Sequence, residues 1–342
     1  MLQGLRDTSG MTDDLDPTPL LRLREGAYAG DLAVAAIAQL DLFTRLGSEA
    51  WSPAEIAAAL GLAVRPATAM CDALEGLGLL DRSGERFTPS ALARAHLTAG
   101  AEADLRPYFE SLSERPAVAE LTAVLRTGAP AAWASSAGGE DWAARLSDPV
   151  FAERFTAAMD ARGRVLAPAL AQALVDLPFQ RVLDVAGGSG VYAAALLAAR
   201  PGIEAAVLER PPVDEASRTL LARRGQSAIA VVAGDMFAGL PAGYDLHLYS
   251  HVLHDWDVPA VESLFRASFA ALAPGGWIVD YDVHTGDGSP AAGAYSALLM
   301  HATEGRCYAE SEIVELVRRA GFASVEVRST IGDRSVVCAR RP

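Results

Sequence analysis

The chain has 342 residues, 51% of them hydrophobic, and no apolar run approaches the ~18 residues that a membrane-spanning helix needs. All 29 basic residues are arginines, which excludes a pyridoxal-phosphate Schiff base, a lysine nucleophile and the lysine of a nucleotide-binding phosphate loop. The net charge of −14 argues against nucleic acid or another polyanion as a partner.

The cysteines and the N-terminus bear on the cell compartment. Cys71, Cys307 and Cys338 are scattered and fit neither a disulfide framework nor a zinc site. The N-terminal residues lack the basic-then-apolar order of a secretory signal. Because no membrane span is evident either, we expect a cytoplasmic protein without a membrane partner.

The N-terminal part of the chain predicts a flexible tail followed by helices. Residues 1–18 contain Pro, Asp, Thr and Gly without an apolar period and are expected to be loose. The segment Leu32 to Phe43 predicts one largely buried helix. A second helix is predicted to start at Ser52 as N-cap, with Pro53 at the first helical position and Glu55 at the third.

A further predicted helix, residues 65–80, and a short hairpin, residues 81–90, complete the outline of a winged helix over residues 19–102. Winged helices often bind DNA, but between residues 51 and 100 five acids outnumber four arginines. The helix that would read DNA, residues 68–77, carries two acids and no base, whereas a DNA reader needs a basic stripe. We therefore expect a packing or dimerisation module.

Residues 103–342 predict an α/β domain. A helical stretch up to about residue 180 leads into a region, starting at Arg181, in which strands and helices alternate. Strands separated by about 10 to 15 helical residues indicate a doubly wound, mostly parallel sheet. The last two strands, residues 324–329 and 335–340, are joined by a short turn and predict a terminal antiparallel hairpin.

A glycine-rich loop, Ala186 to Gly190, joins the first of these strands directly to a helix. Glycines at this turn let a nucleotide lie against bare backbone, and an acidic residue that ends the next strand, here Glu209, can accept hydrogen bonds from ribose hydroxyls. A dinucleotide site usually has a third glycine within the helix, but no glycine follows Gly190 until Gly202. The loop therefore predicts a nucleotide cofactor of another kind.

The end of the third strand adds residues suited to an adenine ring. Asp235 can meet the adenine amino group, and Met236 and Phe237 can form apolar walls for the ring. At the end of the fourth strand follows LYSHVLHDWD.

Taken in order, the motifs VLDVAGGSG, the acidic end at Glu209, GDMF, HVLHDWD, LAPGGWIV and GR…E…AGF carry a family resemblance. The chain resembles, over nearly its whole length, the class I S-adenosylmethionine-dependent O-methyltransferases of the caffeic-acid and bacterial polyketide-tailoring type. The resemblance implies a Rossmann-like methyltransferase domain over residues 103–342 and S-adenosyl-L-methionine as cofactor. It also implies a homodimer formed through the N-terminal winged-helix-like domain, residues 19–102.

The same resemblance assigns positions in the cofactor site. The glycines lie near the methionine part of the cofactor, the acid at the end of the second strand holds the ribose, the GDMF residues surround the adenine, and a serine stands where plant relatives place a lysine. These residues are Gly187, Gly188, Glu209, Asp235, Met236, Phe237 and Ser250.

In the substrate pocket, the resemblance matches Phe155 and Met159 to a Phe…Met pair, although the Asn that usually follows the Phe is Thr156 here. His301 lies on a helix that faces the substrate pocket in this family. By its spacing, Cys307 is also expected in the substrate pocket.

Removing a proton from a hydroxyl acceptor needs a base that titrates near neutral pH, and histidine does so. His254 in HDWD follows the C-terminal end of a strand, where ligands bind in open α/β sheets, and the resemblance assigns the base to the same position. Of two glutamates that orient the base in plant relatives, the first falls on Asp282 and the second on Cys307, where the carboxylate is lost. Asp255 is expected to be a charge at a helix N-terminus or to touch the substrate.

The main hypothesis is therefore an O-methyltransferase acting on a hydroxyl of a small aromatic compound, with His254 as base and without a metal. The alternative is a C-methyltransferase acting on an aromatic or keto acid. In that case His254, Asp255 and His301 could form a two-histidine, one-carboxylate metal site. A third hypothesis, a winged-helix regulator that senses S-adenosylmethionine, is disfavoured by the charge count in the N-terminal helices.

Overall fold

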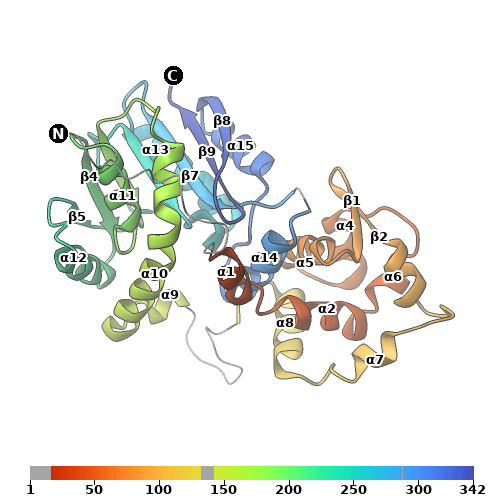
Figure 1. The fold of residues 1–342 in the computed structure, drawn as a ribbon. Coiled ribbons are helices and arrows are strands. Elements are labelled where there is room, and N and C mark those ends of the chain that lie inside the picture. The colour runs from red at the N-terminus through yellow and green to blue at the C-terminus, as the bar shows by residue number, and fades with distance from the viewer. Residues whose placement is uncertain (1–16, 132–141, 287) are drawn as a thin grey trace, which may run out of the picture.

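The computed structural model describes residues 17–131, 142–286 and 288–342 and forms two bodies, a sheet with helices and a smaller helical part (Figure 1). Of the expected flexible tail, residues 1–16 lie outside the described residues. Thr18 is buried and begins helix α1, Thr18–Glu25, so the expected tail extends too far by this residue. Among the described residues no single helix is long and apolar enough to cross a membrane, although the bent pair Pro53–Leu60 and Val64–Gly76 passes that test jointly by length and composition.

The larger body contains a seven-stranded sheet, counted over the described residues, with strand order β5-β4-β3-β6-β7-β9-β8. The first five strands in this order are parallel, and β9 runs antiparallel to both β7 and β8. The doubly wound sheet with a terminal antiparallel hairpin is thus confirmed. Their bounds are β3 Arg181–Val185, β4 Glu204–Glu209, β5 Ala230–Ala233, β6 Leu246–Ser250, β7 Trp277–Val283, β8 Ala323–Ser329 and β9 Arg334–Arg340.

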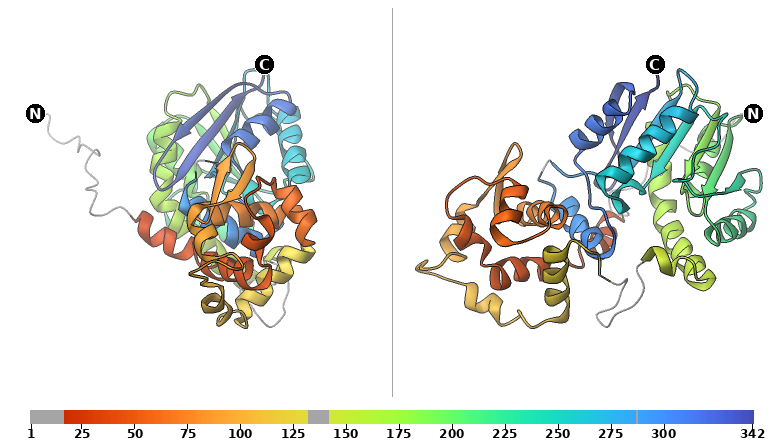
Figure 2. Two further views of the ribbon diagram at one scale, coloured as in Figure 1. Left: turned by 90° about the vertical axis from the view of Figure 1, so that its right-hand side faces the viewer. Right: turned by 180° about the vertical axis from the view of Figure 1, so that it is seen from behind.

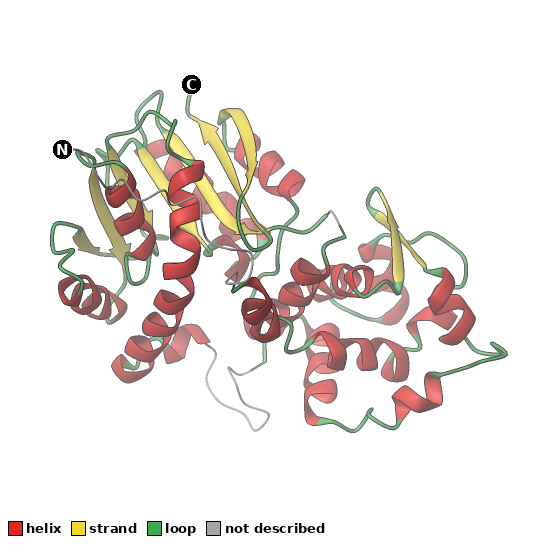
Figure 3. Cartoon of the chain, in the orientation of Figure 1, coloured by secondary structure: helices red, strands yellow, loops and turns green. Residues whose placement is uncertain are grey.

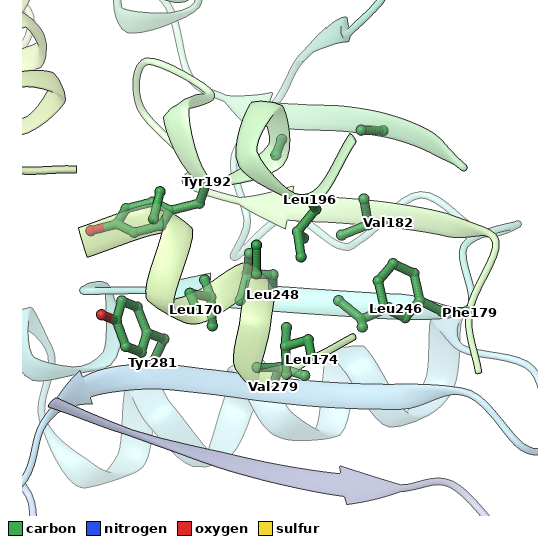
Figure 4. Close-up of a cluster of buried hydrophobic side chains, with 14 of the residues drawn as sticks. Leu170, Leu174, Phe179, Val182, Tyr192, Leu196, Leu246, Leu248, Val279 and Tyr281 are labelled. Carbon is green, nitrogen blue, oxygen red and sulfur yellow. The ribbon is translucent and has the colours of Figure 1, made fainter. Parts of the chain in front are cut away.

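Helices cover both faces of the sheet (Figure 3). One face packs against α10 (Pro149–Ala173), α11 (Val191–Ala199) and α12 (Val213–Arg223), and the other against α13 (Val258–Ala271) and α15 (Glu310–Arg319). Side chains alternate along a strand, so Leu248 lies in the first core and its neighbour Tyr249 in the second. Figure 4 shows the first core, where Leu170 and Leu174 lie near Leu246 and Leu248.

The order of the strands reverses between β3 and β6, which are neighbours although β4 and β5 separate them in the chain. In doubly wound sheets, a crevice opens at the carboxyl ends of the strands at this point and binds the ligand. The fold therefore directs attention to the loops that follow Val185 and Ser250.

The smaller body consists of the N-terminal helices and a two-stranded hairpin. The predicted helix, turn, helix and hairpin are present, and the capping box at Ser52 and Glu55 is confirmed by both of its hydrogen bonds, at 2.8 and 3.3 Å. The elements are α2 Ala29–Val34, the π-helical turn η2 Ala35–Gln39, α3 Leu42–Leu46, α4 Pro53–Leu60, α5 Val64–Gly76, β1 Leu80–Ser83, β2 Arg86–Pro89, α6 Ala91–His96, α7 Arg106–Glu110 and α8 Pro116–Thr127.

The single helix expected from Leu32 to Phe43 is wrong. It passes from α helix into a π turn and stops at Leu40. Asp41 then takes a left-handed backbone conformation with φ of 47°, and its carboxylate accepts a hydrogen bond from Arg106 at 3.0 Å. Asp is one of the few non-glycine residues that tolerate this conformation, so the chain turns here although both flanks are apolar.

Packing does not follow the boundary expected between residues 102 and 103. Leu121 of α8 lies in the hydrophobic core of the N-terminal helices. So does Met300 of α14, Pro290–Ala302, which comes from the far end of the chain. Helix α14 lies against α5 (Figures 1 and 2), and the approach is so close that a Cβ on Gly293 would lie 2.3 Å from the Asp72 carbonyl oxygen.

Candidate active site

A cavity of about 310 Å³ lies at the carboxyl ends of β3 and β6, within the usual size range of small-molecule sites. Its wall is built by the glycine loop, the ends of β4, β5 and β6, the 3₁₀ turn η3 (Leu253–Asp255), and one side each of α10 and α14. The wall includes the following residues singled out from the sequence: Phe155, Met159, Gly187, Gly188, Glu209, Asp235, Met236, Phe237, Ser250, His254 and Asp255.

At one end of the cavity, Glu209 is joined to the glycine loop. Its two carboxylate oxygens accept hydrogen bonds from the backbone N–H groups of Gly188, at 2.9 Å, and Arg210, at 3.1 Å. Burial nevertheless raises the pKa of Glu209 to about 7. Gly188 has φ of +56°, and a Cβ placed there would meet only open space. The loop therefore presents bare backbone to the cavity beside a carboxylate that further donors would stabilise.

Beside this acid lies an apolar slot. The Asp235 carboxylate accepts a hydrogen bond from the Phe237 N–H at 2.9 Å, which fixes the turn after β5. Met236 is buried, whereas the Phe237 ring is 40% exposed and meets Trp256 edge-on at 4.7 Å. A partly exposed aromatic ring next to a carboxylate suits a flat heterocycle that carries an amino group.

At the other end, His254 and Asp282 form a buried pair. The Nδ1 of His254 lies 2.7 Å from Oδ1 of Asp282, which comes from β7. Burial favours the neutral acid, but the imidazoles of His254 and His251 outweigh it and hold the pKa of Asp282 well below its usual range. Burial likewise opposes a charge on His254, but Asp282 and Asp255 outweigh it and raise its pKa.

This pair has a direct chemical consequence. An ionised carboxylate accepts hydrogen bonds only, so the proton of neutral His254 sits on Nδ1 and Nε2 is left as the proton acceptor. The nearest carboxylate to Nε2 is that of Asp255, at 3.7 Å, and burial raises the pKa of Asp255 to about 6. The arrangement can take a proton from a ligand and stabilise the resulting imidazolium.

Comparison with known proteins identifies the family. A family model described as an O-methyltransferase domain matches residues 118–323. The chain belongs to this family. It is 30% identical over 335 residues to the tetracenomycin polyketide synthesis 8-O-methyl transferase TcmO of Streptomyces glaucescens, covering 95% of this chain and 97% of TcmO.

Two further similarities agree. The 3-hydroxy-5-methyl-1-naphthoate 3-O-methyltransferase of Streptomyces sahachiroi is 28% identical, over 90% of each chain. The crystal structure of an O-methyltransferase family 2 protein from Planctomyces limnophilus in complex with apigenin superposes with a TM-score of 0.82 at 25% identity, covering 96% of each chain.

The chain is thus a methyltransferase that uses S-adenosyl-L-methionine, and the residues present fit this cofactor. The bare backbone of the glycine loop, the Glu209 carboxylate and the slot at Phe237 suit an adenosine. The Oγ of Ser250 lines the same cavity and is buried without a hydrogen-bond partner in the described part of the chain. An unpartnered buried hydroxyl in the wall is what a polar ligand would satisfy.

The expected place of His301 is wrong. Tyr295, Leu298 and Leu299 of α14 line the cavity, but His301 on the same helix does not. Its ring stacks on Tyr28 at 4.2 Å, and Nε2 lies 3.2 Å from Glu120, both in the N-terminal body. The metal set of His254, Asp255 and His301 is therefore not brought together.

Cys307 also lies outside the wall of the cavity. It is buried in an apolar cluster with Val283, Tyr295 and Leu299, behind the residues that line the cavity. Burial raises its pKa well above the usual range, so the thiol stays neutral. It replaces the flanking carboxylate of plant relatives with packing rather than with another polar contact to the base.

The wall also includes residues to which the sequence analysis gave no role, among them Arg162, His251 and Tyr295. His251 has φ of +57° and lies 3.2 Å from Asp282, without the angle of a hydrogen bond. It groups with His254 and Asp282 so that one possible ligand atom from each lies within 4.8 Å of the others. Because the Asp282 oxygen already accepts the His254 proton at 2.7 Å, we interpret these residues as a hydrogen-bonded pair, His254 and Asp282, with His251 beside it, rather than as a metal site.

Proposed function

We propose that this O-methyltransferase methylates a hydroxyl group of a small aromatic compound, with His254 as the general base and Asp282 as the group that orients it. The observation that carries the proposal is the 2.7 Å contact between His254 and Asp282 at the wall of the cavity. The names of two relatives support the acceptor class, since one acts in polyketide synthesis and the other on a hydroxynaphthoate.

In this proposal, each group of the wall has one task. When bound, S-adenosyl-L-methionine supplies a methyl group already activated as a sulfonium. Gly187 and Gly188 lie along its methionine part, and Glu209 accepts hydrogen bonds from the ribose. Asp235, Met236 and Phe237 hold the adenine, and the Ser250 hydroxyl forms a hydrogen bond with the cofactor. Phe155 and Met159 line the acceptor side.

The chemical task of the protein is then alignment and proton removal. Holding the acceptor oxygen in line with the methyl group lowers the barrier by avoiding the entropy cost of alignment. A phenol has a pKa of about 10, and a base near neutral pH typically contributes roughly 10²- to 10⁴-fold to its reaction. His254 takes the proton on Nε2, and Asp282 stabilises the imidazolium through Nδ1.

The test is His254→Ala, assayed with labelled S-adenosylmethionine and a panel of phenols, naphthoates and anthraquinones. We expect at least a ~100-fold loss of turnover with unchanged affinity for S-adenosylhomocysteine. The matched control is His284→Gln, because His284 is another buried histidine paired with an aspartate, Asp280 at 3.1 Å, outside the cavity wall. Unchanged turnover in His254→Ala would show that the base lies elsewhere.

The metal set expected for a C-methyltransferase, His254, Asp255 and His301, is not assembled, because His301 lies outside the cavity. The position of the new methyl group is measured directly, since methyl carbons bound to oxygen and to carbon have well-separated NMR shifts. A product methylated on carbon would overturn the proposed acceptor.

We also propose that two copies pair through their N-terminal helices, as the family resemblance implied for residues 19–102. The support is a set of exposed apolar side chains, among which Leu23 is 76% and Tyr108 75% exposed. Light scattering behind size exclusion should give twice the mass of the chain, and a monomer at micromolar concentration would reject pairing.

A further inference from the structure

Arg162 is a cation in the wall of the cavity that bonds no carboxylate among the described residues. It follows Phe155 and Met159 on the same side of α10, at the helical spacing i, i+4, i+7, and all three line the cavity. Its Nη1 donates a hydrogen bond to the Tyr295 hydroxyl at 3.1 Å. Its Nε is buried and has no hydrogen-bond partner within the described residues.

Two arginines are buried as whole residues in the described part of the chain, and both are paired with acids: Arg334 bonds Glu25, and Arg306 bonds Glu312. Of the acids that interact electrostatically with Arg162, Glu25 binds Arg334 and Asp282 accepts the His254 proton. Asp255 lines the same cavity but makes no hydrogen bond to Arg162. Arginine stays charged in proteins, and a buried charge without a partner is costly. An unpaired guanidinium that faces a cavity therefore indicates an anion supplied by the ligand.

We propose that the guanidinium of Arg162 donates hydrogen bonds to an anionic oxygen of a ligand in this cavity, either a carboxylate or a phenolate. This inference rests on the proposed function for the identity of the cavity as the methyl-transfer site. Its place fits the reacting end, since the ring of Tyr295 meets His254 edge-on at 5.4 Å, whereas the acids Glu209 and Asp235 stand at the adenosine end.

Two ligands can supply such an oxygen: the amino-acid carboxylate of the cofactor, or an acidic group on the acceptor. The first source is tested by comparing the binding of S-adenosylhomocysteine with that of 5′-methylthioadenosine, because 5′-methylthioadenosine lacks the amino-acid part. Turnover of an aryl hydroxy acid and of its methyl ester separates the second, because the ester lacks the charge. Arg162→Met removes the charge but keeps an apolar stem, and Arg162→Lys keeps the charge but loses the guanidinium.

The experiment measures two ratios: the affinity for S-adenosylhomocysteine relative to 5′-methylthioadenosine, and the KM of the aryl hydroxy acid relative to its methyl ester. Both are measured in the wild type, Arg162→Met and Arg162→Lys. Arg164→Met is the control, since Arg164 is exposed on the same helix. If the cofactor is the source, Arg162→Met weakens S-adenosylhomocysteine at least tenfold and leaves 5′-methylthioadenosine unchanged. If the acceptor is the source, the KM of the acid rises at least tenfold and that of the ester does not. Arg162→Lys recovers part of either loss.

The inference would be overturned if Arg162→Met left both ratios unchanged, that is, if both members of each pair were affected equally or not at all. Equal losses would mean that Arg162 only supports the fold or sets the pKa of the nearby histidines. The nucleoside pair needs no turnover, so it reports on Arg162 even if His254 proves not to be the base. Failure of all phenols as acceptors would instead reject the proposed function.

Discussion

Replacing Asp282 by asparagine tests the catalytic pair most sharply, because it keeps the shape of the side chain and removes its charge. The contact to lose is the 2.7 Å hydrogen bond from His254 Nδ1 to Oδ1. Hydrogen bonds to charged groups contribute roughly 1.5–3 kcal/mol, and ~1.4 kcal/mol corresponds to tenfold in rate. If this stabilisation is realised on the imidazolium formed in the transition state, kcat falls roughly 10- to 150-fold.

The same substitution should also shift the pH dependence of kcat. In the wild type the carboxylate raises the pKa of His254, so the neutral base is lost as the pH falls through this raised value. Without the carboxylate, only Asp255 opposes the effect of burial, so the pKa of His254 falls below its wild-type value. The acid limb of the Asp282→Asn profile should therefore shift to lower pH while the plateau falls.

The assay is kcat and kcat/KM between pH 5 and 9 at constant ionic strength, with S-adenosylhomocysteine affinity as a check on folding. Asp280→Asn is the matched control, since Asp280 lies two residues earlier on β7 and pairs with His284 at 3.1 Å outside the cavity wall. We expect it to leave kcat within a few-fold. A wild-type plateau in Asp282→Asn, or an acid limb shifted to higher pH, would refute the reasoning.

Two further predictions concern the support of the base and the cofactor end. A Cβ on Gly305 would lie 2.0 Å from the His254 carbonyl oxygen. Gly305→Ala should therefore displace His254 and lower kcat at least ~10-fold while the affinity for nucleosides stays unchanged. An unchanged kcat would contradict this. Burial raises the pKa of Glu209 to about 7, and ribose hydroxyls favour its ionised form. Nucleoside binding should therefore release a proton, and the affinity should fall by up to ~10-fold per pH unit below pH 7. Calorimetry in two buffers measures the proton release and the pH dependence, and Glu209→Gln should abolish both effects.

The parts of the site that the sequence predicted well are those built by neighbours in the chain. The strand, glycine loop and helix around Gly188 form a local unit, and the acid that ends the next strand, Glu209, lands beside it because adjacent parallel strands end at one edge. Asp235 and Phe237 likewise share a single turn. The contact of Asp282 with His254 joins β7 to the turn η3 and was expected only through the family resemblance.

The misplaced residues depend on contacts between distant segments. The period of α14 is apolar on several sides, so its sequence does not tell which side faces the cavity and which faces the N-terminal helices. Docking on α5 decides this, and turns His301 away. Arg162, by contrast, could have been found, because it continues the helical spacing of Phe155 and Met159.

The docking of α14 also bears on the role of the N-terminal body. Arg65, on α5, donates hydrogen bonds to the carbonyl oxygens of Met300, Thr303 and Gly305, at 3.2, 3.1 and 2.8 Å. Gly305 in turn packs directly on the backbone of His254. Since a guanidinium fixes several carbonyls at once, it holds the loop after α14 and, through it, one side of the base. The N-terminal helices therefore help to position His254, the proposed base, so a change that loosens α5 should lower turnover even if the proposed pairing of two copies persists.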